Sequence, residues 1–196
     1  MDRTLSPLPK SFYTKPTLSL AKELLGYILV KETNEGIASG VIVETEAYLG
    51  NADQAAHSFQ NRRTKRTEIM FHEPGLIYTH QMHTHTLINV VTGPVGTPES
   101  VLIRAVEPLG GIELMLKRRP VSNIKNLTSG PGKLTKALGI TMDDYGKAIY
   151  NSSLSIIEGK KPTKIEKGTR IGIDNSGEAK EYPYRFWVPG NPFVSR

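Results

Sequence analysis

The sequence Gly40-Val-Ile-Val-Glu-Thr-Glu-Ala-Tyr-Leu-Gly50 has the composition of a β-strand that carries two acidic side chains. Side chains alternate between the two faces of a strand, so the stretch divides into two sets. One face holds Val41, Val43, Thr45 and Ala47, and the other holds Ile42, Glu44, Glu46 and Tyr48. Because a strand rises about 3.3 Å per residue, we expect Glu44 and Glu46 roughly 7 Å apart on one face.

Two neighbouring carboxylates are suited to acid–base chemistry. They repel each other, and burial raises the pKa of at least one of them, which prepares a general base near neutral pH. The alternative interpretation is an edge strand whose acidic face is solvated. The residues that follow the strand favour the catalytic interpretation.

Composition limits the class of protein. With 196 residues, 38% of them hydrophobic and 22% charged, the chain has the size and character of a soluble globular protein, and we expect one domain over residues 1–196. The sequence contains no cysteine, which excludes disulfides, thiolate metal sites and a cysteine nucleophile and fits a reducing cytoplasm. No apolar run approaches the roughly 20 residues of a membrane helix, and the first residues lack the layout of a signal peptide. We therefore expect a cytoplasmic protein that does not associate with membranes.

Turn residues and hydrophobic periodicity predict a mixed α/β domain. Strands are expected at residues 27–32, 38–48, 76–91, 101–106, 150–158 and 170–173, the first two forming an antiparallel hairpin. The tail, residues 184–195, is expected to form a further strand followed by a turn. Helices are expected at residues 18–25, 109–118 and 131–139. Thr17 or Ser19 is expected to cap the first helix, while Gly26 and Gly139 mark the ends of the first and third.

Clustered positive charge indicates a polyanionic partner. The net charge is +6 and the pI is about 9.4, with cations concentrated in Arg62-Arg63-Thr64-Lys65-Arg66 and in Lys117-Arg118-Arg119. Lys133 follows Gly130-Pro-Gly at a predicted helix N-terminus, which suits one backbone phosphate or, alternatively, simple helix capping. A Walker phosphate loop is excluded, because Leu127 and Leu134 stand where that motif needs Gly and Ser or Thr.

All five histidines (His57, His72, His80, His83 and His85) lie between positions 57 and 85. Such density raises the question of a metal site completed by Glu44 or Glu46. The sequence contains no His-Glu-x-x-His pair, and the spacing of the histidines matches no zinc motif. We therefore predict no metal site and interpret the histidines as a wet or binding surface.

Two polar residues interrupt apolar strands. Arg104 lies within Val101-Leu-Ile-Arg-Ala-Val106, and a buried arginine needs an anionic partner, for which Glu44 and Glu46 are the candidates. Such a pair can be structural or catalytic. Asn89, between Ile88 and Val90, is either a satisfied core amide or a recognition group.

Several of these stretches together resemble the alkyladenine (3-methylpurine) DNA glycosylases. The resemblance covers nearly the whole chain in order. It rests on Val43-Glu-Thr-Glu-Ala-Tyr-Leu-Gly50, Ala55-Ala-His-Ser58, Met70-Phe71, Pro74-Gly-Leu-Ile-Tyr78, Asn89-Val-Val91, Leu102-Ile-Arg-Ala-Val-Glu-Pro-Leu109, Ser129-Gly-Pro-Gly-Lys-Leu134, Arg170-Ile-Gly-Ile173 and Arg185-Phe-Trp-Val-Pro-Gly-Asn-Pro-Phe-Val-Ser195.

The resemblance implies a monofunctional, cofactor-free enzyme that flips an alkylated, or also a deaminated, purine out of duplex DNA and hydrolyses its N-glycosidic bond. It implies that Glu46 activates the water, which Arg104 and the main chain of Ile171 help to hold. It also implies that Tyr48 and His57 contact the flipped base. Asn89 would crowd the purine 2-position.

The same resemblance implies a single compact, monomeric domain with a curved, mainly antiparallel sheet and a protruding hairpin that enters the minor groove. Double-stranded DNA containing damaged purines would be the partner, at the nucleoid if the protein is bacterial. Its backbone would be contacted by the cations Arg62, Arg63, Lys65, Arg66 and Lys133.

The hairpin departs from the family pattern. Its sequence, Tyr78-Thr-His-Gln-Met-His-Thr-His-Thr-Leu-Ile-Asn89, is one residue shorter and lacks tyrosines that the family typically carries there. By the resemblance, His80 takes the place of a stacking tyrosine, and either Met82 or His83 is the wedge that enters the DNA. A histidine in the stacking position predicts pH-dependent binding.

Three other functions remain to be weighed against the glycosylase. A histidine-rich metal-dependent hydrolase would contain stoichiometric metal, and a non-catalytic protein that binds damaged DNA would not need Glu46. An O-glycosidase using Glu44 and Glu46 is disfavoured, because both carboxylates lie on one strand rather than flanking a sugar.

Overall fold

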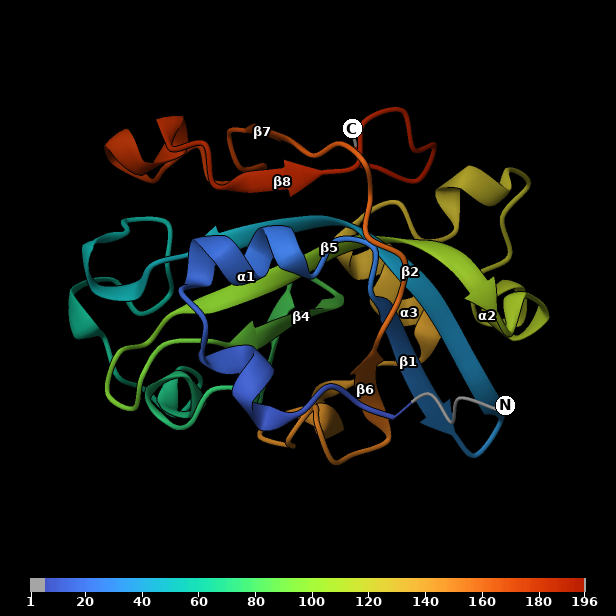
Figure 1. Ribbon diagram of the computed structural model, residues 1–196, viewed down its shortest axis with the longest axis horizontal. Helices are drawn as coiled ribbons and strands as arrows, with labels where there is room; N and C mark the ends of the chain where they lie inside the picture. Colours follow the sequence, from blue (N-terminus) through green and yellow to red (C-terminus); the bar gives the residue numbers. More distant parts are fainter. Residues whose placement is uncertain (1–5, 196) are drawn as a thin grey trace.

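The long strand β2 (Gly36–Tyr48) runs through the middle of the fold in the computed structural model, which describes residues 6–195 (Figure 1). One edge of β2 pairs along its length with β5 (Ser100–Gly110). On the other edge, its first half pairs with β1 (Ile28–Thr33) and its second half, at residues 44–46, pairs with β8 (Arg185–Trp187). Both edges of β2 are therefore hydrogen-bonded around the two acidic residues.

The remaining strands extend this sheet in both directions. The order is β3-β4-β5-β2-β1-β6, and β8 also pairs with β7. The added strands are β3 (Ile77–Met82), β4 (His85–Val91), β6 (Leu154–Ile157) and β7 (Glu166–Gly168). Every strand pairing within the described residues is antiparallel, and the sheet curls. The predicted mixed α/β domain with a curved antiparallel sheet is confirmed.

Three α-helices pack against the sheet and share its main core. They are α1 (Thr17–Glu23), α2 (Ile112–Arg118) and α3 (Pro131–Leu138), supplemented by 3₁₀ turns at Lys10–Thr14, Gly50–Ala52, Phe59–Asn61, Glu68–Phe71, Ile124–Asn126, Met142–Asp144 and Gly177–Glu181. Leu20, Met115 and Leu134, one from each helix, are fully buried in the same apolar cluster. This shared core makes residues 6–195 one compact unit.

A β-bulge overturns the predicted strict alternation along β2. The register between β2 and β5 shifts between Ile42 and Glu44 and again between Glu44 and Thr45. As a result Ile42 and Ala47 lie in the same main core, although one is even-numbered and the other odd-numbered. Val43 instead joins a separate apolar cluster. A bulge inserts an extra residue, so side chains beyond it exchange faces.

Other predicted elements differ at their ends or in kind. Residues 170–173 were expected to form a strand but form a bend, and the edge strand is β7 instead. The second helix begins at Ile112 because β5 continues to Gly110 and Gly111 then adopts a φ of +69°. The expected strand at 76–91 is the β3–β4 hairpin, and that at 150–158 is limited to β6.

The ends of α1 and α3 give one correction and one confirmation. Neither Thr17 nor Ser19 caps α1: the N-cap is Pro16, and the Thr17 hydroxyl lies 2.7 Å from that of Thr92. Helix α3 ends at Gly139, whose φ of +79° is the left-handed conformation predicted there. Within residues 6–195, no helix combines the length and apolar character needed to cross a membrane.

Candidate active site

The carboxylate of Glu46 is fully buried near the end of β2 and has three polar partners. Its Oε1 accepts a hydrogen bond from the backbone N–H of Ile171 at 2.8 Å and lies 3.3 Å from Nη1 of Arg104. Its Oε2 accepts a hydrogen bond from the Tyr48 hydroxyl at 2.8 Å. Burial raises the pKa of Glu46, while the Arg104 charge and the two hydrogen bonds oppose that rise. The predicted grouping of Glu46, Arg104 and Ile171 is therefore present.

Glu44 has a different environment, although it is equally buried. Its Oε1 accepts hydrogen bonds from Nε of Arg104 (3.0 Å), Nε of Arg185 (2.7 Å) and the Ser195 hydroxyl (2.8 Å). Its Oε2 accepts one from the Ser195 backbone at 2.7 Å. These contacts bind the C-terminal segment to the sheet, which makes Glu44 a structural residue.

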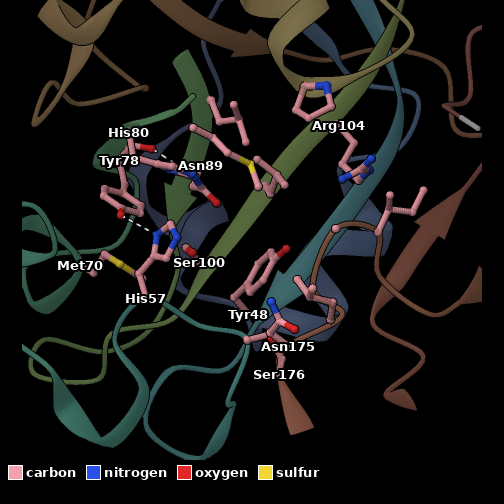
Figure 2. Close-up of a pocket in the computed structure, with 18 of the residues that line it drawn as sticks. Tyr48, His57, Met70, Tyr78, His80, Asn89, Ser100, Arg104, Asn175 and Ser176 are labelled. Atoms are coloured by element: carbon pink, nitrogen blue, oxygen red, sulfur yellow. Dashed lines mark hydrogen bonds between the residues drawn. The ribbon is translucent and has the colours of Figure 1, made fainter. Parts of the chain in front are cut away.

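A cavity of about 450 Å³ opens beside the Glu46 carboxylate. Its wall includes Tyr48, Arg104 and Ile171, the three groups that bind Glu46, so the carboxylate lies directly behind that wall. Figure 2 shows Tyr48 on one side of the open space and His57 on the other. All four residues predicted to contact a base line this cavity, namely Tyr48, His57, His80 and Asn89.

Three aromatic rings form the wall opposite Tyr48. Tyr78 and His80 are stacked, with ring centroids 5.1 Å apart and an angle of 25° between the planes. His57 meets His80 edge-on at 4.6 Å, and its Nδ1 lies 2.8 Å from the Tyr78 hydroxyl. Successive contacts between the rings thus hold His57 and His80 in fixed orientations.

Asn89 fixes the tautomer of His80. The Asn89 side-chain nitrogen donates to the Tyr78 carbonyl at 3.3 Å and lies 3.2 Å from Nδ1 of His80. Because an amide nitrogen only donates, His80 Nδ1 is the acceptor and the ring carries its proton on Nε2. Figure 2 shows the Asn89 oxygen turned toward the cavity.

Both pocket histidines are neutral at neutral pH. Burial, followed by the neighbouring His57 and Arg66, lowers the pKa of His80 to about 3. Partial burial and the charges of Arg66 and Arg62 lower the pKa of His57 to about 4, although the His57 ring remains exposed at the pocket mouth. A pKa of about 3 places the titration of His80 well below neutral pH, and the pH dependence of binding stays a prediction.

Comparison with known proteins bears directly on this site. The family model described as methylpurine-DNA glycosylase (MPG) matches residues 11–192. The chain belongs to the methylpurine-DNA glycosylase family. A "putative 3-methyladenine DNA glycosylase" of Oceanobacillus iheyensis is 65% identical over 195 residues, which cover 100% of this chain and 98% of that protein. Proteins of the same name from Bacillus subtilis (61% over 196 residues, 100% of both chains) and Listeria monocytogenes (53% over 185 residues, 94% of this chain and 89% of that protein) are also similar.

The family identified from the sequence is thereby confirmed, and its hairpin corresponds to β3–β4. Met82 pairs with His85 across a two-residue turn that contains His83, whose φ is +55°. Met82 is 44% exposed and lines the rim of the main cavity. His83 lines a second groove of about 270 Å³, which the hairpin forms with Lys133 and the start of α3. The strand predicted over residues 76–91 would include His83, but the structure places His83 in the turn.

The five cations predicted to contact a DNA backbone differ in their side-chain partners. Arg62, Arg63, Lys65 and Arg66 are all exposed, but Arg63 and Arg66 have side-chain partners. Arg63 is bound by Glu68 at 2.6 and 2.8 Å, and Nη2 of Arg66 lies 2.7 Å from Nε2 of His57. Lys133 is 3.5 Å from the Ser129 hydroxyl. Contact of these five with DNA stays a prediction.

The histidines do not form one cluster in this family member. His57 and His80 lie in the pocket, His83 and His85 lie at the hairpin tip, and His72 pairs with Glu68 at 3.0 Å. Over residues 6–195, no group of three His, Asp or Glu side chains converges as metal ligands would.

Sequence reasoning missed two parts of the site. The first is Tyr78, whose ring stacks on His80 in the pocket wall. The i, i+2 spacing of Tyr78 and His80 places both on one strand face, and this spacing could have indicated the contact. The ion pair between Asp53 and Arg170 was also missed. No local pattern connects two residues 117 positions apart.

Proposed function

We propose that this member of the methylpurine-DNA glycosylase family flips alkylated, and also deaminated, purines out of duplex DNA and hydrolyses their N-glycosidic bond. The observation that carries the proposal is the buried Glu46 carboxylate behind the wall of an aromatic cavity, held by Arg104, Ile171 and Tyr48. The names of the similar bacterial proteins support 3-methyladenine as one substrate.

The cavity suits a flat cationic base. A purine between Tyr48 and the wall of His57 and His80 would contact rings on both of its faces (Figure 2). Alkylation at a ring nitrogen gives the purine a positive charge, which aromatic faces attract. Neutral imidazoles do not repel that charge, and the lowered pKa values of His57 and His80 keep both rings neutral at pH 7.

The proposed reaction is a metal-free hydrolysis. Water held near Glu46, Arg104 and the Ile171 main chain attacks C1′ of the sugar, and Glu46 accepts a proton from that water. The bond between C1′ and the purine nitrogen breaks, and its electron pair stays on the base. An alkylated purine cation thereby leaves as a neutral molecule, so it needs no proton from a general acid. A neutral deaminated purine leaves as an anion, which takes up a proton from solvent water. Arg104 offsets the negative charge of Glu46 before the proton transfer.

We assign the hairpin and the surface cations to DNA binding. The exposed Met82 or His83 at the tip of β3–β4 would occupy the space that the flipped base vacates. Arg62, Arg63, Lys65, Arg66 and Lys133 would contact phosphates. In this proposal one domain over residues 1–196 acts as a monomer, without a cofactor, on double-stranded DNA in the cytoplasm, at the nucleoid if the cell is bacterial.

The experiment that tests this function is base release from duplex DNA containing methylated purines, hypoxanthine or ethenoadenine, with EDTA present. We expect free base and abasic sites from the wild-type protein and neither from Glu46→Gln. Lesion binding without release would instead support a non-catalytic binding protein. Activity that appears only after metal is added would support a metal-dependent hydrolase.

A further inference from the structure

Asp53 and Arg170 form a buried ion pair beside the candidate active site. Nη1 and Nη2 of Arg170 donate to the two carboxylate oxygens of Asp53 at 2.6 and 2.8 Å. The side chains are 1% and 0% exposed, respectively. Asp53 also accepts hydrogen bonds from the backbone N–H groups of Leu49 and Ala55, at 3.0 and 3.1 Å. The pair therefore fixes the segment that connects the end of β2 to His57.

Arg170 also contacts the two residues of β2 that follow Glu46. Its Nη1 donates to the carbonyl of Ala47 at 2.9 Å, and its guanidinium lies 4.6 Å from the centroid of the Tyr48 ring. The next residue in the chain, Ile171, donates its backbone N–H to Glu46. One side chain thus connects the strand that carries Glu46 and Tyr48 to the loop that supplies a hydrogen bond to Glu46.

These contacts exceed what a stability role requires. A buried ion pair is weak support for stability, because removing both charges from water offsets their attraction. Moreover, Nε of Arg170 is buried without a hydrogen-bond partner within residues 6–195, and an unsatisfied buried donor destabilises the folded state. The arrangement is better explained by the geometry that it imposes on its neighbours.

We propose that Asp53 and Arg170 are positioning residues, which hold the Ile171 N–H on Glu46 and the Tyr48 ring against the cavity. This inference rests on the proposed function, in which Glu46 is the general base. Neither residue touches the base or the water. Their effect is on the alignment of Glu46 and on the electrostatic field around it.

The first test separates chemistry from binding. Arg170→Lys keeps the charge but loses the two-pronged contact with Asp53 and the flat face against Tyr48, and Asp53→Asn keeps the shape but loses the charge. We expect each variant to bind lesion-containing duplex within about threefold of wild type, whereas the single-turnover rate of base release falls at least tenfold.

A second buried ion pair provides the matched control. Lys31 and Asp144 are joined at 2.6 Å with side chains 8% and 1% exposed, and neither lines the cavity. Asp144→Asn should therefore lower thermal stability without lowering the rate of base release at 25 °C. Equal loss of rate in Asp53→Asn and Asp144→Asn would overturn the proposal, as would a wild-type rate in Arg170→Lys.

The pH dependence of the rate of base release is a second test, because a purely structural role of the ion pair would leave its acid limb unchanged. The charged and polar groups around Glu46 come from three strands and one loop. The strands supply Glu44 and Tyr48 (β2), Arg104 (β5) and Arg185 (β8), and the loop supplies Arg170 and the Ile171 N–H. Asp53→Asn leaves the positive charge of Arg170 uncompensated, which lowers the pKa of Glu46. The acid limb of the pH–rate profile then moves to lower pH. Arg170→Gln leaves the Asp53 charge and moves the limb to higher pH. We expect opposite shifts of about half a unit.

The outcomes distinguish the two proposals. Wild-type protein that releases no base at any pH would reject the proposed function and the positioning role together. If the wild type is active but the acid limbs of Asp53→Asn and Arg170→Gln shift in the same direction, or do not shift, only the positioning role is rejected. If Arg170→Lys and Asp53→Asn both fail to fold, the pair is structural and the proposal is overturned.

Discussion

Glu44 and Glu46 are bound to the same guanidinium. Arg104 donates from Nε to Glu44 at 3.0 Å, and its Nη1 lies 3.3 Å from Glu46. The two carboxylates nevertheless differ, because Glu44 also binds Arg185 and Ser195, whereas Glu46 binds the cavity residues Tyr48 and Ile171. Two acids with equal burial therefore have separate roles, one in structure and one beside the pocket.

Replacing Glu46 with glutamine should abolish base excision while leaving DNA binding largely intact. The amide keeps the shape but cannot accept a proton, and general base catalysis typically contributes about 10²–10⁴-fold. Single-turnover release of 3-methyladenine at pH 7 measures the change, and lesion-duplex affinity serves as the control. Turnover at the wild-type rate would exclude Glu46 as the base.

Replacing Glu44 with glutamine should mainly affect folding. The substitution removes the counter-charge of Arg185 and one of the two counter-charges of Arg104, and breaking buried pairs in this way costs about 3–5 kcal/mol. Urea denaturation at pH 7 measures the free energy of unfolding. Glu46→Gln is the matched control, and an equal loss of stability in both variants would contradict the division of roles.

Much of this site follows from local sequence pattern, because its main residues lie on regular strands. The spacing of Glu44 and Glu46 identifies them as a pair, and Arg104 requires an acidic partner because it is a charge in an apolar strand. The bulge after Ile42 was not predictable, since it depends on how β2 pairs with β5 rather than on β2 alone. Strand pairing between distant segments leaves little trace in either segment.

The bend at residues 170–173 shows the same limit. Its apolar and β-branched residues suggested a strand, but β8 already occupies the edge of β2 at Glu44–Glu46. The bend instead turns the Ile171 N–H toward Glu46. The β-propensity of a segment makes a strand possible, but the segment forms one only where a sheet edge is free to pair with it.

Replacing His80 with tyrosine should reduce the loss of unfolding free energy that occurs as the pH falls below 6.5. His80 has a folded-state pKa of about 3, below the ordinary value of 6.5, so the unfolded chain takes up this proton first as the pH falls. Stability is fully present above pH 6.5 and is lost as the pH falls toward 3. Chemical denaturation at pH 7, 5.5 and 4 should show a smaller loss in His80→Tyr. Parallel curves for the two proteins would show that His80 does not bind its proton differently in the two states.

The affinity for duplex DNA should fall steeply with salt, and the individual cations should contribute unequally. Each phosphate contact contributes about 0.9 to the slope of log affinity against log salt. Arg62 and Arg63 are both exposed, but Arg63 is held by Glu68 and lies 4.9 Å from the Phe71 ring centroid. Arg62→Ala should therefore reduce the slope by about one and Arg63→Ala by less. Fluorescence anisotropy at several salt concentrations measures both, and a flat response in wild type would count against a phosphate-binding surface.

Separate substitutions of Met82 and His83 at the hairpin tip should show that Met82 is the side chain that enters the DNA. Met82 is 44% exposed at the cavity rim, and an apolar side chain there can replace a flipped base in the stack. Met82→Ala should therefore weaken lesion binding about tenfold, which corresponds to about 1.4 kcal/mol. His83 has a φ of +55°, which glycine adopts without strain, so His83→Gly should raise stability by about 0.5–1 kcal/mol and leave lesion binding unchanged. Anisotropy titrations and thermal unfolding of both variants decide the assignment. A loss of binding in His83→Gly with none in Met82→Ala would reverse it.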